Sequence, residues 1–174
     1  MKLRFVVPLL LTAIVVPKVA FSADEPAKYT IADEFRAGVL GFPWGTDLEQ
    51  VATNFPAGVA WPAVSSGSRP PVERYYAVPD DTPILGLSRK GQQTMFGFDR
   101  SNRLIHAIFA MPYSAKAQLM SKARTLFGRP GRSSAVGLQR WISWAPVDGV
   151  AMNIIEIPHD TRPSLFVMVV WTLK

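Results

Sequence analysis

The chain has 174 residues, a formal net charge of +6 and no Cys, and 48% of its residues are hydrophobic. The lack of Cys excludes disulfides, thiolate metal sites and a Cys nucleophile, while the length suits one domain with its own core. Residues 23–88 have four Lys/Arg against nine Asp/Glu (net −5), residues 89–140 ten against one (net +9), and residues 141–174 two against three (net −1). The basic segment favours contact with an anionic partner. The competing interpretation is that the acidic segment neutralises it in the fold.

The amino terminus has the three parts of a secretory signal. Lys2 and Arg4 precede an apolar run over residues 5–16, and small residues stand at positions 20 and 22, where a signal peptidase reads them. The run is too short for a membrane-spanning helix, which needs about 20 apolar residues. We therefore expect an exported protein, periplasmic or secreted, with the following parts: a signal peptide over 1–22 cleaved near Ser22, a loosely ordered lead-in over 23–35, and a single domain over 36–174.

Residues 41–51, GFPWGTDLEQV, form the most motif-like stretch of the chain. Its two glycines, Gly41 and Gly45, are separated by three residues and no Lys follows, so the stretch does not have the spacing of a phosphate-binding P-loop. It also lacks the third glycine of a dinucleotide-binding fingerprint. The stretch is better explained as the start of a helix.

Thr46 and Glu49 have the spacing of a helix capping box. They are followed by apolar residues on one helical face, namely Leu48, Val51, Ala52 and Phe55. We expect a helix that starts at Thr46 and stops at Pro56, with Trp44 filling the core beneath it.

The rest of the chain alternates strand patterns with turn residues, interrupted by one further helix. We expect the helix over 115–127, with Gly128 as its C-cap, and strands over residues 73–78, 84–88, 92–98, 104–111, 138–144, 150–157 and 165–173. The last strand is apolar on both faces, so we expect it to be central in a covered sheet. The fold class is therefore α+β: a mostly antiparallel sheet with two helices packed on it, in an order that suggests two related halves.

Two charged residues stand among apolar neighbours. Lys116 lies on the apolar side of the second helix, so it must extend to solvent or meet an acidic partner. Glu156 stands between two Ile residues of a strand. An edge or solvent-facing position would explain Glu156, and a partly buried carboxylate paired with Arg is the alternative.

Catalytic and metal-binding patterns are weak. The two histidines, His106 and His159, have no second ligand at a metal-binding spacing, and the chain has no Gly-x-Ser-x-Gly nucleophile motif. We therefore expect no metal, no cofactor and no enzymatic activity. The alternative is a metal-independent hydrolase acting on an envelope polymer, with His106 or Glu156 as its base.

Three stretches carry a family resemblance: GFPWGTDLEQV, LFGRP at residues 126–130 and RWISW at residues 140–144. A helix ending in Gly-x-Pro and leading into a Trp-bearing hairpin resembles small exported, uncharacterised bacterial envelope proteins. It is also similar to the helix-then-sheet units of SmpA-type outer-membrane assembly lipoproteins and of β-lactamase-inhibitor-like folds. The resemblance implies protein binding or scaffolding on an antiparallel sheet.

These observations favour an exported, non-enzymatic binding or scaffold protein of the bacterial envelope that contacts a protein or an anionic envelope component. A binder of anionic lipid or glycopolymer is the second alternative, and export argues against nucleic acid. Exposed aromatic residues beside Arg suit a binding surface. The residues expected to make the contact are Arg129, Arg132, Arg140, Trp141 and Trp144.

Overall fold

The computed structural model describes residues 29–63 and 71–172. The expected signal peptide over 1–22 lies outside these residues, as do residues 23–28 of the expected lead-in. No helix among the described residues is long and apolar enough to cross a membrane.

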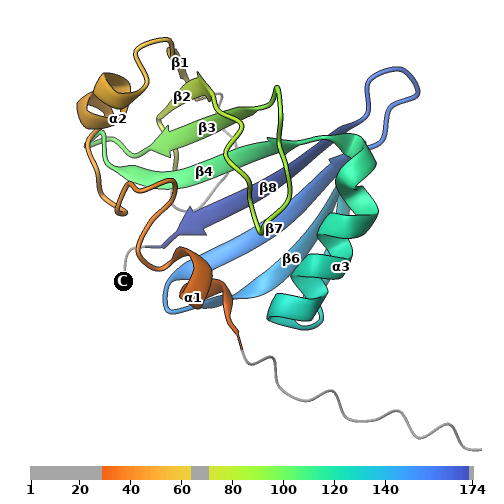
Figure 1. Ribbon diagram of the computed structural model, residues 1–174. Coiled ribbons are helices and arrows are strands. Elements are labelled where there is room, and N and C mark those ends of the chain that lie inside the picture. Colours follow the sequence, from red (N-terminus) through yellow and green to blue (C-terminus); the bar gives the residue numbers. More distant parts are fainter. Residues whose placement is uncertain (1–28, 64–70, 173–174) are drawn as a thin grey trace, which may run out of the picture.

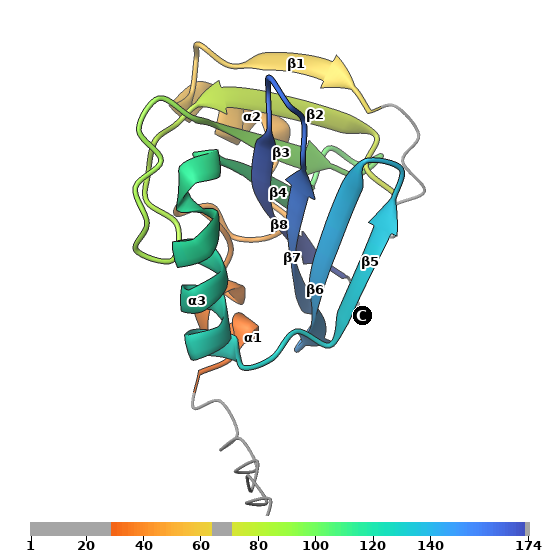
Figure 2. The same ribbon diagram turned by 90° about the vertical axis from the view of Figure 1, so that its right-hand side faces the viewer.

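One antiparallel sheet of eight strands forms the framework of the domain, in the order β1-β2-β3-β4-β8-β7-β6-β5 (Figures 1 and 2). The strands are β1 (Val59–Pro62), β2 (Arg74–Pro79), β3 (Gln93–Phe98), β4 (Leu104–Met111), β5 (Arg132–Val136), β6 (Gln139–Val147), β7 (Val150–Ile157) and β8 (Ser164–Trp171). Strand β8 lies between β4 and β7, as expected for the last strand, and it joins the meander β1–β4 to the meander β5–β7. The mainly antiparallel α+β fold is thus confirmed.

Three α-helices and one short 3-10 helix accompany the sheet: α1 (Ile31–Phe35), α2 (Leu48–Asn54), η1 (Tyr113–Ala115) and α3 (Lys116–Phe127). Helices α1 and α3 lie on one face of the sheet, as Figures 1 and 2 show together. The core between this helix-bearing face and the helices is formed by buried side chains that include Phe96, Phe109, Leu119, Ala123, Met152, Ile154 and Val167.

Helix α1 corrects the expectation of a loosely ordered lead-in up to residue 35. Thr30 and Asp33 form a capping box, in which the Asp33 N–H donates to Thr30 Oγ1 (3.2 Å) and the Thr30 N–H donates to Asp33 Oδ2 (2.7 Å). Ile31 and Phe35 of this helix are buried in the core. Five residues are too short to show a helical repeat, so polar residues dominated the sequence pattern.

The capping box expected at Thr46 and Glu49 is wrong. Helix α2 begins at Leu48 after Asp47, without a side-chain cap, and the Thr46 hydroxyl instead donates to the Pro43 carbonyl (2.7 Å). The reason is tertiary: the Leu48 N–H, free in an isolated helix, donates to the Asn102 carbonyl of the β3–β4 turn (3.1 Å). A backbone acceptor from a distant segment therefore satisfies the helix start.

Three other expected features have mixed outcomes. Gly128 caps α3 with a positive φ of 73°, as expected. Trp44 is half-buried against the core; its indole N–H donates to the Phe35 carbonyl (2.7 Å) and its ring stacks on Trp171. The strand expected over 84–88 is instead a tight turn closed by a bridge between Ile84 and Leu87, because the intervening Leu85 and Gly86 adopt positive φ.

Candidate functional site

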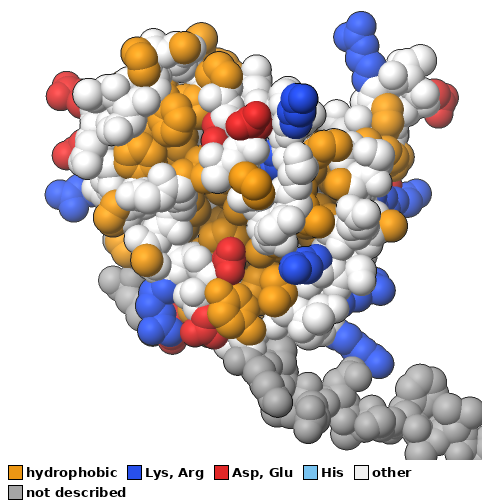
Figure 3. Space-filling view, in the orientation of Figure 1, with side chains coloured by type: hydrophobic (Ala, Val, Ile, Leu, Met, Phe, Trp, Pro, Cys, Tyr) orange, Lys and Arg blue, Asp and Glu red, His pale blue; other side chains and the backbone are white. Residues whose placement is uncertain are grey.

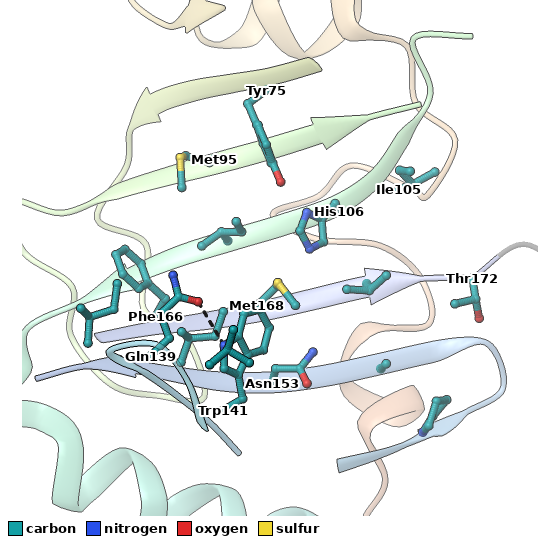
Figure 4. Close-up of a pocket in the computed structure, with 17 residues that line it drawn as sticks. Tyr75, Met95, Ile105, His106, Gln139, Trp141, Asn153, Phe166, Met168 and Thr172 are labelled. Carbon is teal, nitrogen blue, oxygen red and sulfur yellow. Dashed lines mark hydrogen bonds between the residues drawn. The ribbon is translucent and has the colours of Figure 1, made fainter. Parts of the chain in front are cut away.

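The face of the sheet opposite α1 and α3, here called the open face, carries an apolar hollow of about 800 Å³ (Figure 4). Successive side chains of a strand point to opposite faces, so β7 directs Met152 and Ile154 toward the helices and Asn153 and Ile155 into the hollow. The hollow is lined by Tyr75, Met95, Ile105, His106, Ile108, Val136, Gln139, Trp141, Pro146, Ala151, Asn153, Ile155, Ile157, Phe166, Met168, Val170 and Thr172.

The lining has no charge at neutral pH. None of the residues that line the hollow is Asp, Glu, Lys or Arg. At the two edges of the sheet, Trp61 of β1 and Val136 of β5 remain 40% and 66% exposed. An open apolar concavity with exposed apolar edges is the kind of surface that proteins use for binding.

His106 of β4 is the most unusual side chain of the hollow. It is only 3% exposed, and neither ring nitrogen has a hydrogen-bond partner among the described residues. Burial lowers the pKa of His106 from 6.5 to about 4, so the ring is neutral at pH 7. Most buried polar groups in proteins are hydrogen-bonded, which makes this neutral, unpartnered imidazole a candidate ligand contact.

Gly97 of β3 makes room for His106. A Cβ atom at position 97 would lie 2.7 Å from the His106 Cβ and 3.1 Å from a Val72 methyl group. On the neighbouring strand β2, the ring of Tyr75 lies 6.1 Å from the His106 ring, and burial raises the pKa of its phenol. The local fold thus encloses His106 between neutral groups.

Other polar groups lie farther across the hollow, toward β6 and β7. The Trp141 indole N–H donates to Gln139 Oε1 (3.1 Å), so these two residues of β6 are hydrogen-bonded to each other (Figure 4). Asn153 is half-buried on β7. The hollow therefore has one buried polar end at His106 and Tyr75, with Phe166, Met168 and Trp141 forming an apolar stretch beyond it.

Glu156 lies on the other, helix-bearing face, where it is buried beneath the start of α3. The Tyr113 hydroxyl donates to its Oε1 atom (2.6 Å), Lys116 forms an ion pair with the same oxygen, and Arg140 Nη1 lies 3.9 Å from Oε2. Burial raises the pKa of Glu156, but the hydrogen bonds from Lys116 and Tyr113 outweigh it and hold the pKa below the ordinary value. The carboxylate is buried and paired, so the edge or solvent-facing interpretation is wrong.

His106 and Glu156 do not form a common site, because they project from opposite faces of the sheet. His159, the other histidine, is exposed in the β7–β8 loop, where it accepts backbone N–H groups of Thr161 and Arg162. Within the described residues, no group of three or more His, Asp or Glu could hold a metal ion.

The five residues expected to bind a partner are divided between the two faces. Trp141 lines the hollow. Arg132 is on the same side of the sheet, because it pairs with Ser143, which follows Trp141 by two residues on β6 and therefore shares its face. Arg140 lies on the helix-bearing face beside Glu156. Trp144 is buried there, with its indole N–H donating to the Gly128 carbonyl (3.0 Å). Arg129 is exposed beyond α3.

The basic segment is also divided. Arg89 is buried and paired with Asp80, and Lys116 and Arg140 meet Glu156. On the helix-bearing face, Figure 3 shows the Lys and Arg side chains as separate groups with neutral surface between them. Acidic residues thus neutralise part of the basic segment within the fold.

Sequence reasoning did not find the hollow, although a signal was present. Strand β8 is apolar on both faces, and this pattern led to the expectation of a sheet covered on both sides. Helices α1 and α3 cover one face, and the second apolar set of β8, which includes Phe166, Met168 and Val170, lines the hollow. The same apolar pattern is also compatible with a sheet that has helices on one face and an uncovered apolar hollow on the other.

Fold and hollow together define an α+β domain built on one antiparallel sheet with an open apolar face. No family model and no curated protein matches the chain. Among solved structures, a DUF4309 family protein (YjgB) from Bacillus subtilis is similar, with 9% identity and a TM-score of 0.43 over 73% of this chain and 79% of that chain. A similarity at this level carries no argument about function, and the resemblance to SmpA-type and β-lactamase-inhibitor-like proteins stays a prediction.

Proposed function

We propose that this chain is an exported, non-catalytic binding protein that holds an apolar small molecule in the hollow of its open face. The observation that carries the proposal is the hollow itself: about 800 Å³, lined by apolar and aromatic side chains and without charge. Small-molecule sites typically measure about 300–1,000 Å³ and combine apolar walls with a few polar groups. His106, Tyr75 and Asn153 are such groups here.

A small molecule fits these features better than an anionic envelope component does. The basic residues lie on both faces of the sheet, and several are paired with acids. A contiguous basic strip, which an anionic polymer or lipid surface would need, is not seen on the helix-bearing face (Figure 3). The export of the protein rests on the amino-terminal sequence pattern.

The test is a titration with N-phenyl-1-naphthylamine, an uncharged probe that becomes fluorescent in apolar surroundings. We expect saturable binding by the wild-type protein. Asn153→Asp, which adds a charge to the hollow with almost no change in shape, should weaken binding by at least about tenfold, since the carboxylate must stay hydrated. Gln118→Glu adds the same charge on the exposed surface of α3 and should leave binding unchanged.

Two outcomes would overturn the proposal: no saturable binding, or equal binding by the wild-type protein and Asn153→Asp. If Asn153→Asp does not fold, as judged by circular dichroism, Met168→Lys serves as a second charged variant in the same hollow. Probe binding that is lost equally in Gln118→Glu would also count against the hollow as the site.

A further inference from the structure

The unpartnered His106 ring indicates what kind of polar group the ligand carries. An unmade hydrogen bond to a buried polar group costs about 1–3 kcal/mol, and both nitrogens of His106 are in this state among the described residues. The ring lines the hollow, beside the apolar stretch formed by Phe166, Met168 and Trp141 (Figure 4). A ligand that hydrogen-bonds to this ring would recover the cost on binding.

We propose that the ligand of the hollow is an uncharged amphiphile: a molecule with an aliphatic or aromatic body over β8 and β7 and a neutral hydrogen-bonding group, such as a hydroxyl, at the His106 ring. This inference rests on the proposed function, since it names the chemical class of the molecule that the same site binds.

The absence of charge in the lining argues for a neutral head group. The only titratable residues among those that line the hollow are His106 and Tyr75. Burial lowers the pKa of His106, so the imidazole is neutral at pH 7. The Tyr75 phenol is neutral at pH 7 already at the ordinary pKa of Tyr, and burial raises its pKa further. A carboxylate, phosphate or ammonium group would lose its hydration here without meeting an opposite charge.

The chemistry of neutral imidazole favours a group that both donates and accepts. One ring nitrogen carries the proton and donates, and the other accepts. A hydroxyl can therefore pair with either nitrogen, whichever tautomer is present, and the amide of a neutral ligand can do so through its N–H or its carbonyl. A purely apolar ligand would leave the cost of the unpaired ring in place.

The position of His106 also fixes the direction in which the ligand lies. The ring nitrogens are closed off from solvent, so the head group reaches them by displacing a covering side chain. The Tyr75 ring, 6.1 Å away and tilted by 45°, is the aromatic neighbour on that side. The body of the ligand then extends from β4 across β8 and β7 toward Trp141, where Met168 offers a flexible apolar side chain.

The experiment compares four octyl compounds as competitors of N-phenyl-1-naphthylamine at pH 7: octanol, 1-chlorooctane, octanoate and octyltrimethylammonium. We expect octanol to bind at least about fivefold more tightly than either ion, because only the ions lose hydration without compensation. The comparison of octanol with 1-chlorooctane is then repeated in His106→Phe. The affinity of octanol relative to 1-chlorooctane should be at least about fivefold lower in His106→Phe than in the wild type. This difference measures the coupling energy between the ligand hydroxyl and His106.

The possible results separate the apolar site itself from the neutral head group of its ligand. No binding of the naphthylamine probe would overturn the proposed function itself. If the probe binds but octanoate or octyltrimethylammonium binds as tightly as octanol, the proposal of a neutral head group is overturned, and the apolar hollow stays as the site. The same holds if the ratio of the octanol and 1-chlorooctane affinities is unchanged in His106→Phe. If His106→Phe does not fold, the imidazole ¹⁵N resonances of wild-type His106 provide the readout: octanol should shift them and 1-chlorooctane should not.

Discussion

Lys116, the first residue of α3, forms an ion pair with Glu156, near the end of β7 on the sheet's helix-bearing face. The Glu156 side chain is buried, whereas Lys116 keeps part of its side chain in solvent, and the Tyr113 hydroxyl donates to the same carboxylate oxygen. The contact joins η1 and α3 to β7. It also explains why a cation stands at a helix start, where the helix dipole disfavours it.

We predict that Glu156→Gln lowers the free energy of unfolding by about 1–3 kcal/mol, because the amide cannot replace a charged acceptor for Lys116 and Tyr113. The pKa of Glu156 is lowered in the fold, so its contribution is present above the ordinary Glu pKa and is lost as pH falls through the lower, folded value. Urea unfolding at a series of pH values checks this. Equal stability of variant and wild type at pH 7 would contradict it.

His106 gives a different pH dependence. In the unfolded chain His106 takes up its proton near pH 6.5, and in the fold it does so near pH 4. Between these values the unfolded state binds more protons, so the free energy of unfolding should fall as pH decreases from about 6.5 to about 4, by at most ~3 kcal/mol. In His106→Phe this decrease in the free energy of unfolding should disappear. The decrease due to Glu156, which occurs at lower pH, should persist. A wild-type stability that is flat over this range would show that the ring is not neutral and buried.

Arg89 and Asp80 form the second buried ion pair. The guanidinium donates to the carbonyls of Ala110, Thr82 and Gln93, to the Thr94 hydroxyl and to Asp80, and its centre lies 5.1 Å from the Phe109 ring. The Arg89 side chain is fully buried. These bonds tie the β2–β3 connection to the end of β4.

Arg89→Met should therefore lower the free energy of unfolding by about 3–5 kcal/mol, since it leaves the Asp80 carboxylate buried without its cation. Arg89→Lys should not restore the lost stability, because a single ammonium group cannot hydrogen-bond to all the acceptors that the planar guanidinium reaches. Arg100→Met, at an exposed turn position, is the matched control and should change little. Thermal and urea unfolding provide the measurement, and similar losses in both Met variants would argue against a special role of Arg89.

Gly97 is required for the enclosure of His106. Gly97→Ala should lower the free energy of unfolding by about 1–3 kcal/mol, because the added Cβ would lie 2.7 Å from the His106 Cβ and one strand must shift. In Gly131→Ala the new Cβ would have its nearest neighbour at 3.9 Å, so this variant should be close to neutral. If the two variants were equally stable, the close contact of β3 with His106 would be refuted.

The sequence predicted the class of fold because its strands are marked by strong local signals. The strand patterns over 92–98, 104–111 and 150–157 coincide closely with β3, β4 and β7, and Gly128 ends α3 where expected. It failed where a distant segment decides the local structure. At the start of α2 the Leu48 N–H donates to the Asn102 carbonyl, and the expected capping contacts between Thr46 and Glu49 are not made. No local sequence pattern contains that information.

The candidate site was predicted only in part, and the reason is again long-range. Trp141 and Trp144 were both expected to contact a partner, but they lie three residues apart on β6 and so face opposite sides of the sheet, which places only Trp141 in the hollow. Lys116 was expected to need solvent or an acid, and Glu156 supplies the acid. That His106 joins Tyr75 and Met168 in one hollow depends on strand order, with β8 inserted between β4 and β7. A single sequence does not reveal that insertion.

The central claim is that the open face binds an apolar small molecule, and an amide chemical-shift titration with N-phenyl-1-naphthylamine tests it most directly. We predict that the shifted resonances belong to strands whose side chains line the hollow, above all β4, β7 and β8 around His106, Asn153 and Met168, and that α3 is largely unaffected. Shifts confined to α3 and the helix-bearing face, or the absence of any saturable shift, would contradict the claim.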